Sequence, residues 1–329
     1  MLHFIESLGD PIALSNAEDE IERIHKFDQR SIDAINAALG AGRPLLVRGE
    51  PGVGKSQLAE AAAKVLKRAF ISKVVDSRTE SRDLMYEFDA VARLAEAQLH
   101  HEGREDARKQ LAIRRFVIPG PLWWAFDAER AKCHCKDVGI ELAATPLKRG
   151  DNEKLAPNGW VVLIDEIDKG ETDVPNGLLE ALGLREFTPP DTEKPVALAK
   201  GIPAPLIIIT TNEERVLPAA FERRCAALSL ALPRQKERLI MKLVEVGQSH
   251  FANETEVKVL RAAAEILADD REEAEKDMLK PLPGQAEYLD MLRAVIRRSD
   301  GDRKRQMDLL KNVRHFIVRK AAEMQKGDE

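Results

Sequence analysis

Residues 49–56 read Gly49-Glu50-Pro51-Gly52-Val53-Gly54-Lys55-Ser56 and match the phosphate-binding pattern G-x-x-x-x-G-K-[ST]. An apolar segment, 44–48, precedes this stretch, and a run of helix-forming residues, 57–66, follows it. The order of strand, glycine-rich loop and helix suits an anion, because a helix N-terminus directs its N–H groups toward negative charge. The stretch therefore predicts a site for a nucleoside triphosphate.

The residue types within this loop have different roles in phosphate binding. Gly52 and Gly54 allow the backbone to curl around phosphates, since neither carries a Cβ atom. The Lys55 ammonium can neutralise the β- and γ-phosphates, and the Ser56 hydroxyl can ligate Mg²⁺. We expect the nucleotide to be held by the consecutive residues Glu50, Pro51, Gly52, Val53, Gly54, Lys55, Ser56 and Gln57.

Composition limits the alternatives for the whole chain. The chain has 329 residues, of which 44% are hydrophobic and 33% charged, with a net charge of −5. This acidic balance argues against a dedicated nucleic-acid binder. No apolar run approaches the ~18 residues of a membrane span, and three cysteines do not make a disulfide framework. We expect a cytoplasmic protein without a membrane segment.

Apolar runs and helical periodicities alternate up to about residue 232, and only helical periodicity follows. This order predicts an α/β domain with a parallel sheet and a helical domain attached to it. We assign residues 1–27 to an N-terminal extension, 28–232 to the nucleotide-binding domain and 233–329 to the helical domain. A long segment at about 86–159 is expected to be an insertion.

Two acids end the most continuous apolar run, Trp160-Val161-Val162-Leu163-Ile164. Ligands of parallel sheets collect at the carboxyl ends of the strands, so Asp165 and Glu166 are expected beside the phosphates. Asp165 would hold Mg²⁺ and Glu166 would orient or deprotonate the attacking water. The alternative is an acidic loop that follows a buried strand and has no catalytic role.

Two further candidates stand next to predicted strands. Asn212 ends an apolar strand, where its amide can bond the γ-phosphate or the attacking water; the alternative is a turn residue. Arg223-Arg224 precedes the last strand, where a guanidinium could reach the nucleotide of a neighbouring subunit. Spacing alone does not favour this interpretation over a solvated basic pair.

The order of these motifs resembles that of the AAA+ ATPases, specifically the MoxR-like group of the helix-2-insert clade of P-loop NTPases. The resemblance rests on the phosphate loop, on 162–166 with Asp168-Lys169, on Thr211-Asn212 and on 217–225. It also rests on 77–86 and on Pro121-Leu122-Trp123-Trp124.

The resemblance implies a five-stranded parallel sheet with a C-terminal helical lid, assembled as a ring of usually six copies that bind ATP and Mg²⁺ between subunits. Arg224 matches the arginine that a neighbour supplies, with Arg223 the weaker match, and Asn212 matches the residue called sensor 1. MoxR-like proteins commonly act with a partner that carries a von Willebrand factor A domain, and they remodel or mature protein complexes.

The sequence departs from the MoxR-like pattern in two places. The lid segment 280–287 lacks the arginine that such lids often supply, and Lys280 is the candidate substitute. Residues 127–159 form a longer polar insertion than the group carries. Within it, Cys133-His134-Cys135 lacks the spacing of a zinc site and indicates an exposed loop instead. Trp123-Trp124 is expected to pack in the core or in a subunit interface rather than to anchor a partner.

Three functions fit these features. The first is an ATPase that remodels a protein partner, and intact Glu166 with the Arg223-Arg224 pair favours it. The second is a nucleotide-gated switch or scaffold with little turnover of its own, which the missing lid arginine favours. The third is a nucleotide-driven nucleic-acid motor, against which the acidic balance argues.

Overall fold

The structure is a computed structural model that describes residues 4–6, 9–14, 23–99, 111–192 and 194–317. Its internal contacts divide the chain into two compact units. The sheet unit comprises the described residues of 1–7, 29–47 and 59–228. The lid unit comprises those of 8–28, 48–58 and 229–329, so the phosphate loop groups with the C-terminal helices. The domain limits placed at residues 27 and 232 stay predictions.

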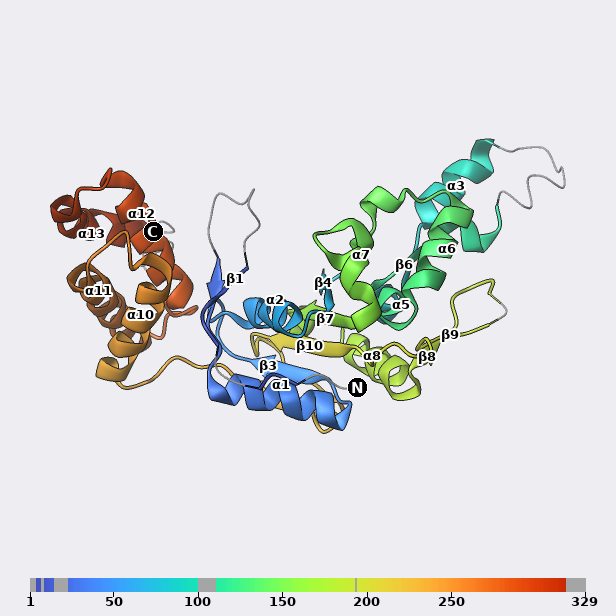
Figure 1. Cartoon of the computed structure of the whole chain (residues 1–329), viewed down its shortest axis with the longest axis horizontal. Coiled ribbons are helices and arrows are strands. Elements are labelled where there is room, and N and C mark those ends of the chain that lie inside the picture. Colours follow the sequence, from blue (N-terminus) through green and yellow to red (C-terminus); the bar gives the residue numbers. More distant parts are fainter. Residues whose placement is uncertain (1–3, 7–8, 15–22, 100–110, 193, 318–329) are drawn as a thin grey trace. The chain divides into compact units, whose positions relative to one another are not determined.

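A five-stranded parallel sheet forms the centre of the sheet unit, in the order β11-β3-β10-β7-β4 (Figure 1). The strands are β3 (Leu45–Arg48), β4 (Ala69–Val74), β7 (Trp160–Asp165), β10 (Leu206–Thr211) and β11 (Ala226–Ser229). In register, Val162 of β7 lies opposite Ile71 on one side and Ile207 on the other. Every residue of β10 is buried, as expected for a strand that is covered on both faces. The predicted α/β fold is confirmed.

Helices precede and follow these strands. They are α1 (Gln29–Ala41), α2 (Lys55–Val65), α3 (Ala90–Leu99), α5 (Pro121–Phe126), α6 (Ala128–Val138), α7 (Asn152–Leu155), α8 (Asp173–Leu184) and α9 (Ala219–Glu222). Short antiparallel pairs join β1 (Ile12–Ala13) to β2 (Ile24–His25), β5 (Tyr86–Phe88) to β6 (Val117–Pro119), and β8 (Glu186–Phe187) to β9 (Val196–Ala197). The 3₁₀ turns are η1 (Ser81–Leu84), η2 (Ile113–Phe116), η3 (Leu142–Ala144), η4 (Pro146–Lys148), η5 (Ala156–Asn158) and η6 (Ile167–Lys169).

Three segments allow a local comparison with the sequence. Residues 72–76 are predicted to form a strand, whereas β4 begins earlier, at Ala69, because Ala69 and Ile71 are core residues. The highly charged run 100–115 is predicted to be an exposed helix; it lies outside the described residues up to 110, and its last residues belong to the η2 turn. The polar insertion predicted at 127–159 folds into α6, α7 and three 3₁₀ turns.

The insertion also covers the outer edge of the sheet at β4. Asn152, at the start of α7, is 6% exposed. Its carboxamide accepts a bond from the Phe70 amide (2.8 Å) and donates to the Phe70 carbonyl (2.7 Å). The same nitrogen donates to the Pro146 carbonyl at 2.9 Å. One side chain therefore pairs with both backbone groups of an edge-strand residue, as a neighbouring strand would.

The aromatic segment belongs to the core of the sheet unit. Trp123 and Trp124 are each 1% exposed and pack with Phe126, Trp160 and Phe187 in one hydrophobic cluster. Cys135 of α6 is buried in the same cluster, and His134 bonds the Val117 carbonyl at 2.8 Å. The predicted packing role of the tryptophans is confirmed, whereas the exposed loop expected at 133–135 is a helix with one buried face.

The C-terminal part of the lid unit consists of four helices, which confirms the predicted helical lid. They are α10 (Lys236–Phe251), α11 (Val257–Lys276), α12 (Gln285–Arg298) and α13 (Arg303–Ile317). Leu243, Leu260 and Leu292 are buried between them, and the Tyr288 hydroxyl donates to the Leu260 carbonyl. Such packing, rather than helix propensity, supplies most of the stability of short helices.

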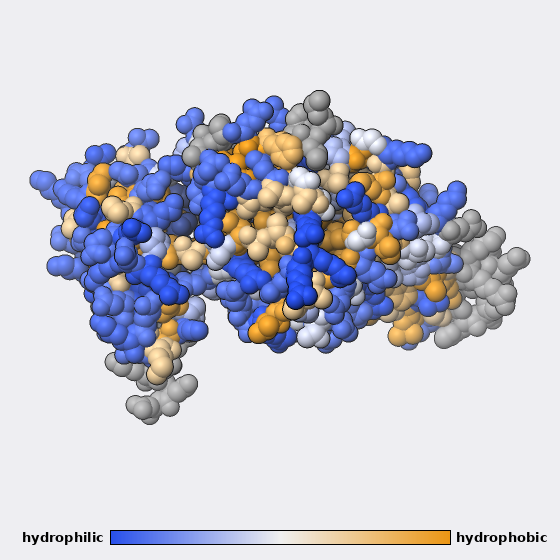
Figure 2. Space-filling model, turned by 90° about the horizontal axis from the view of Figure 1, so that it is seen from below, coloured by the Kyte–Doolittle hydropathy of each residue, from blue (hydrophilic) through white to orange (hydrophobic). Residues whose placement is uncertain are grey.

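The described surface mixes hydrophilic and hydrophobic residues, and Figure 2 shows one face on which hydrophilic residues predominate. Large apolar side chains that remain exposed include Val216, Met278 and Val91. Of the helices in the described ranges, none has the length and apolar character needed to cross a membrane.

Candidate nucleotide site

The backbone of the phosphate loop depends on its glycines. Gly49, Gly52 and Gly54 have φ angles of 150°, 76° and 91°, a region that other residues rarely adopt. A Cβ on Gly49 would lie 2.0 Å from the Leu230 carbonyl oxygen. A Cβ on Gly52 would lie 2.8 Å from the Cβ of Ala286. The loop conformation is thus restricted to glycine by dihedral angle and by space.

Lys55 begins helix α2 and is 6% exposed. Its ammonium donates to the carbonyl of Gly49 at 2.6 Å and to that of Glu50 at 2.9 Å. The loop's own carbonyls therefore hold the lysine within the loop. A buried ammonium at a helix N-terminus, in a glycine-rich turn, has the donors that bound phosphates require. Of the predicted residues, 50–54 lie in this loop and 55–57 form the first residues of α2.

An acidic cluster lies at the carboxyl end of β7 in the sheet unit and consists of Asp165, the last residue of the strand, with Glu166 and Asp168. Thr210, which is fully buried on β10, donates its hydroxyl to Asp165 (2.5 Å) and accepts the Glu166 amide (2.9 Å). One hydroxyl thus fixes two consecutive acids to the neighbouring strand. The sheet therefore brings the two acids to the carboxyl end of β10, as their positions after the strand predict.

The carboxylate of Glu166 is engaged at both oxygens. Asn212 donates its side-chain amide to Oε1 at 3.2 Å, and Lys169 pairs with Oε2 at 2.7 Å. The hydrogen bond and the charge of Glu166 raise the pKa of Lys169 above its usual value. Glu166 itself has φ 60° and ψ 47°, a left-handed conformation that is uncommon outside glycine and clusters at functional sites. The structure places the predicted base and the predicted sensor in direct contact.

Asp168 orders the loop that follows β10, a role that spacing alone did not assign. It is 3% exposed and accepts the backbone amides of Asn212 (3.2 Å) and Glu214 (2.9 Å). A buried carboxylate with such donors is a positioning group for the Asn212 side chain. In the sequence, Asp168-Lys169 stood out only as part of the family resemblance, and no role was assigned to it.

Arg224 lies on the surface, in the turn between α9 and β11. The preceding residue, Arg223, is also exposed, and its carbonyl accepts a long bond (3.4 Å) from the Arg43 guanidinium. An exposed position suits a residue that acts on another subunit, and it equally suits a solvated basic pair. The role of Arg224 stays a prediction.

Arg271, a lid residue for which the sequence predicted no role, contacts the phosphate loop through its side chain. Arg271 lies on α11, is 9% exposed, and donates to both carboxylate oxygens of Glu50 at 2.8 and 2.7 Å. Lys280 is exposed. Sequence reasoning missed this pair, because Glu50 and Arg271 are 221 positions apart. The only local feature of the sequence that pointed to this pair was Glu50, an acid within a phosphate-binding loop.

The two predicted magnesium ligands belong to different units, Ser56 to the lid unit and Asp165 to the sheet unit. The Ser56 hydroxyl and the Asp165 carboxylate are hard oxygen ligands, the type that Mg²⁺ takes together with substrate phosphates. In the described ranges, no group of three or more His, Cys, Asp and Glu side chains could hold a metal ion.

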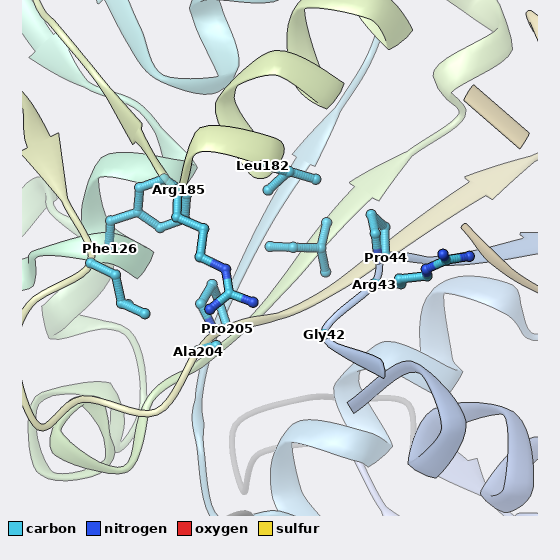
Figure 3. Close-up of a pocket in the computed structure, with 10 residues that line it drawn as sticks. Gly42, Arg43, Pro44, Phe126, Leu182, Arg185, Ala204 and Pro205 are labelled. Atoms are coloured by element: carbon cyan, nitrogen blue, oxygen red, sulfur yellow. The ribbon is translucent and has the colours of Figure 1, made fainter. Parts of the chain in front are cut away.

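A separate pocket lies at the opposite end of the sheet (Figure 3). Pro44 and Pro205, which directly precede β3 and β10, line it together with Phe126, Leu182 and Arg185. Ligands of open parallel sheets bind at the carboxyl ends of the strands. This pocket is at the amino ends and is therefore not the candidate nucleotide site.

Two solved structures are similar to this chain at low sequence identity. A solved "putative ATPase" of Cytophaga hutchinsonii is similar at 14% identity, over 88% of this chain and 79% of that chain, with a TM-score of 0.35. A point mutant of RuvB from Thermotoga maritima is similar at 14% identity, over 87% and 68%, with a TM-score of 0.43. No curated protein matched this chain.

The family comparison covers the phosphate loop, the acidic cluster and the Arg223-Arg224 pair. Residues 44–225, more than half of the chain, match the model of the AAA domain in its dynein-related subfamily. An ATPase-type P-loop domain is therefore present, in agreement with the glycine-restricted loop and the acids at the ends of the strands. The chain belongs to the AAA domain family, dynein-related subfamily.

Proposed function

We propose that the chain hydrolyses ATP and uses the energy to remodel or activate a protein partner, as a cytoplasmic ring ATPase of the MoxR-like type. The observation that carries the hydrolytic part is the contact between Glu166 and Asn212 at the ends of β7 and β10. A carboxylate held by an amide, in a family of P-loop ATPases, is the arrangement that positions and activates a water molecule.

The chain's own residues account for each step. Lys55 and the loop amides bind the β- and γ-phosphates, and Ser56 and Asp165 would hold Mg²⁺, which neutralises charge on the phosphates. Glu166 accepts a proton from water while the water oxygen attacks the γ-phosphorus. The bond from the γ-phosphorus to the bridging oxygen breaks, so that ADP leaves with the electron pair. Asn212 orients the water or the γ-phosphate, and Arg224 of a neighbouring copy stabilises the charge that develops.

A ring of six copies, acting with a von Willebrand factor A domain protein or another client, completes the proposal. It is supported by the resemblance to the MoxR-like group, and the exposed position of Arg224 is compatible with it. The net charge of −5 gives no support to a nucleic-acid partner.

The second candidate is a nucleotide-gated switch that turns over little by itself. The observation that favours it is that Lys169 and Asn212 occupy both oxygens of Glu166. A Glu166 carboxylate that is held in this way can accept a proton from water only after Lys169 or Asn212 is displaced. A client or an ordered ring could supply that displacement.

The test is ATP turnover per subunit over a wide range of protein concentration. Turnover that rises and then reaches a plateau supports a site completed by a neighbour, whereas low, flat turnover supports the switch. Glu166→Gln should lower turnover ~10²-fold or more and leave ATP binding intact. Wild-type turnover in this variant would overturn the assignment of the base.

Mixing two inactive variants tests whether the site is shared. Copies with Glu166→Gln retain Arg224, and copies with Arg224→Ala retain Glu166. If Arg224 acts on a neighbour, a mixture should recover part of the turnover that neither variant has alone. Arg223→Ala is the matched control and should retain most of the turnover. A mixture without recovery would contradict a shared site.

A further inference from the structure

The lid unit contains an ion pair between helix α11 and the phosphate loop. One nitrogen of the Arg271 guanidinium bonds both oxygens of Glu50, and another donates to the Pro283 carbonyl at 2.9 Å. Glu275, on the same helix, is 3.9 Å from Nε. Glu50, Arg271 and Pro283 all belong to the lid unit.

The pair is asymmetric in its exposure. The Arg271 side chain is 11% exposed, whereas that of Glu50 is 41% exposed. A cation that is so far removed from water depends on its carboxylate partner. Glu50 is also the residue whose backbone carbonyl holds Lys55 at 2.9 Å. A single residue of the loop therefore contacts two cations, one through its side chain and one through its backbone.

The charge of Glu50 conflicts with the task of the loop. A carboxylate in the segment that is to receive phosphates repels them, and because the Glu50 side chain is 41% exposed, salt should screen this repulsion. Arg271 cancels this charge in the observed structure. The net effect of the loop on an incoming anion consequently depends on whether Glu50 and Arg271 are both present.

We propose that the Glu50–Arg271 pair sets the affinity of the loop for nucleotide phosphate. Glu50 lowers this affinity, and Arg271 restores it by cancelling the charge of Glu50. This proposal rests on the proposed nucleotide binding. It makes α11 a determinant of affinity through its charge and not through packing alone.

The test is the dissociation constant of a fluorescent ATP analogue, measured with Mg²⁺ at low and high salt. Arg271→Gln leaves Glu50 uncompensated and should weaken binding about tenfold, whereas Glu50→Gln leaves Arg271 uncompensated and should tighten it about tenfold. The double variant should return close to the wild-type value. Each single effect should shrink at high salt, because screening reduces interactions between exposed charges.

Controls separate charge from structure. Arg271→Lys keeps the charge and should retain most of the affinity, even though it loses the forked geometry. Glu275→Gln removes an acid from the same guanidinium at a greater distance and should change affinity less than Glu50→Gln. Thermal unfolding of every variant identifies those that fail to fold, and these are excluded from the comparison.

The outcomes distinguish this inference from the proposed function. If Glu50→Gln and Arg271→Gln both weaken binding, or if neither changes it, the ion pair has only a structural role and the inference is overturned. If the wild-type chain does not bind the analogue, and Lys55→Ala makes no difference, the proposed nucleotide site itself fails. Opposite shifts in the two variants support both.

Discussion

The acidic cluster and the phosphate loop serve the same proposed reaction but are held in different ways. The acids after β7 are fixed by donors from the adjacent strand and its loop, chiefly Thr210 and the amides that Asp168 accepts. The phosphate loop is fixed by glycine backbone angles, by its own carbonyls and by Arg271 from a distant helix. The first arrangement follows from strand order, and the second depends on a contact that no local pattern contains.

The largest expected effect tests the backbone of the phosphate loop. Gly49→Ala places a Cβ 2.0 Å from the Leu230 carbonyl oxygen, at a φ of 150°. We expect a loss of about 2–4 kcal/mol in the free energy of unfolding and no measurable nucleotide binding. Denaturant unfolding and titration with an ATP analogue measure these effects.

Gly139→Ala is the control for this substitution. Its φ of 81° is also positive, but nothing lies within 4 Å of the added Cβ. The cost there should be about 1 kcal/mol, with nucleotide binding unchanged. Equal losses in the two variants would mean that dihedral strain, and not the contact with Leu230, restricts the loop.

The next effect tests the hydrogen bonds of the acidic cluster. Asp168→Ala removes the acceptor of the Asn212 and Glu214 amides, which should cost about 1–3 kcal/mol. Turnover should fall about tenfold or more because Asn212 loses its position, while ATP binding stays near wild type. Asp168→Asn retains one acceptor oxygen and should recover part of both losses. Full turnover in Asp168→Ala would show that Asn212 is held by other contacts.

A smaller effect in the opposite direction is expected at Lys169. Lys169→Met releases Oε2 of Glu166 from its ion pair and should raise basal turnover several-fold, on the order of 3–10. Steady-state phosphate release measures it. Lys154→Met, which breaks the exposed Lys154–Asp151 pair at the same sequence spacing, should have no effect. A decrease with Lys169→Met would instead make the lysine a positive participant in the reaction.

The smallest effect concerns acid sensitivity in the lid unit. Burial lowers the pKa of His25 and of His250 to about 4 in each case. Because the unfolded chain takes up protons below about pH 6.5, stability is present above that pH and is lost as the pH falls toward 4. His25 should account for about 1–2 kcal/mol of this loss at pH 5.

His25→Gln, measured by thermal unfolding at pH 7.5 and pH 5, should reduce the difference between the two pH values. The sheet unit contains His134, whose pKa burial also lowers. His134→Gln is therefore the matched variant. If it removed as much of the acid sensitivity as His25→Gln, the lid unit would have no special role in that sensitivity.

Most of the sheet and the acidic side of the site could be predicted from the sequence, because strand ends determine them. Asp165, Glu166 and Asn212 each follow a buried apolar run, so parallel pairing brings them together. The ion pair between Lys169 and Glu166 depends on a local turn, η6, that no periodicity reveals. Arg271 could not be assigned, because its partner is in a segment of the chain more than two hundred residues away.

The insertion shows a similar limit. Polar composition predicted an insertion at 127–159 and an exposed loop at 133–135, but Ala131 and Cys135 recur four positions apart and bury one face of α6. Asn152 has no special pattern around it, and its role depends on where α7 meets β4. A polar side chain that bonds the backbone of an edge strand, as Asn152 does at β4, can be recognised only when the position of that strand is known.

The contact between Asn152 and Phe70 bears on how copies of the chain can associate. An open sheet edge offers backbone donors and acceptors to any extended peptide, which is a common route to aggregation and to strand exchange. At β4 the Phe70 amide and carbonyl are already bonded. This edge is thereby protected against lengthening by a foreign strand, so copies that assemble would have to meet through side chains rather than by joining their sheets there.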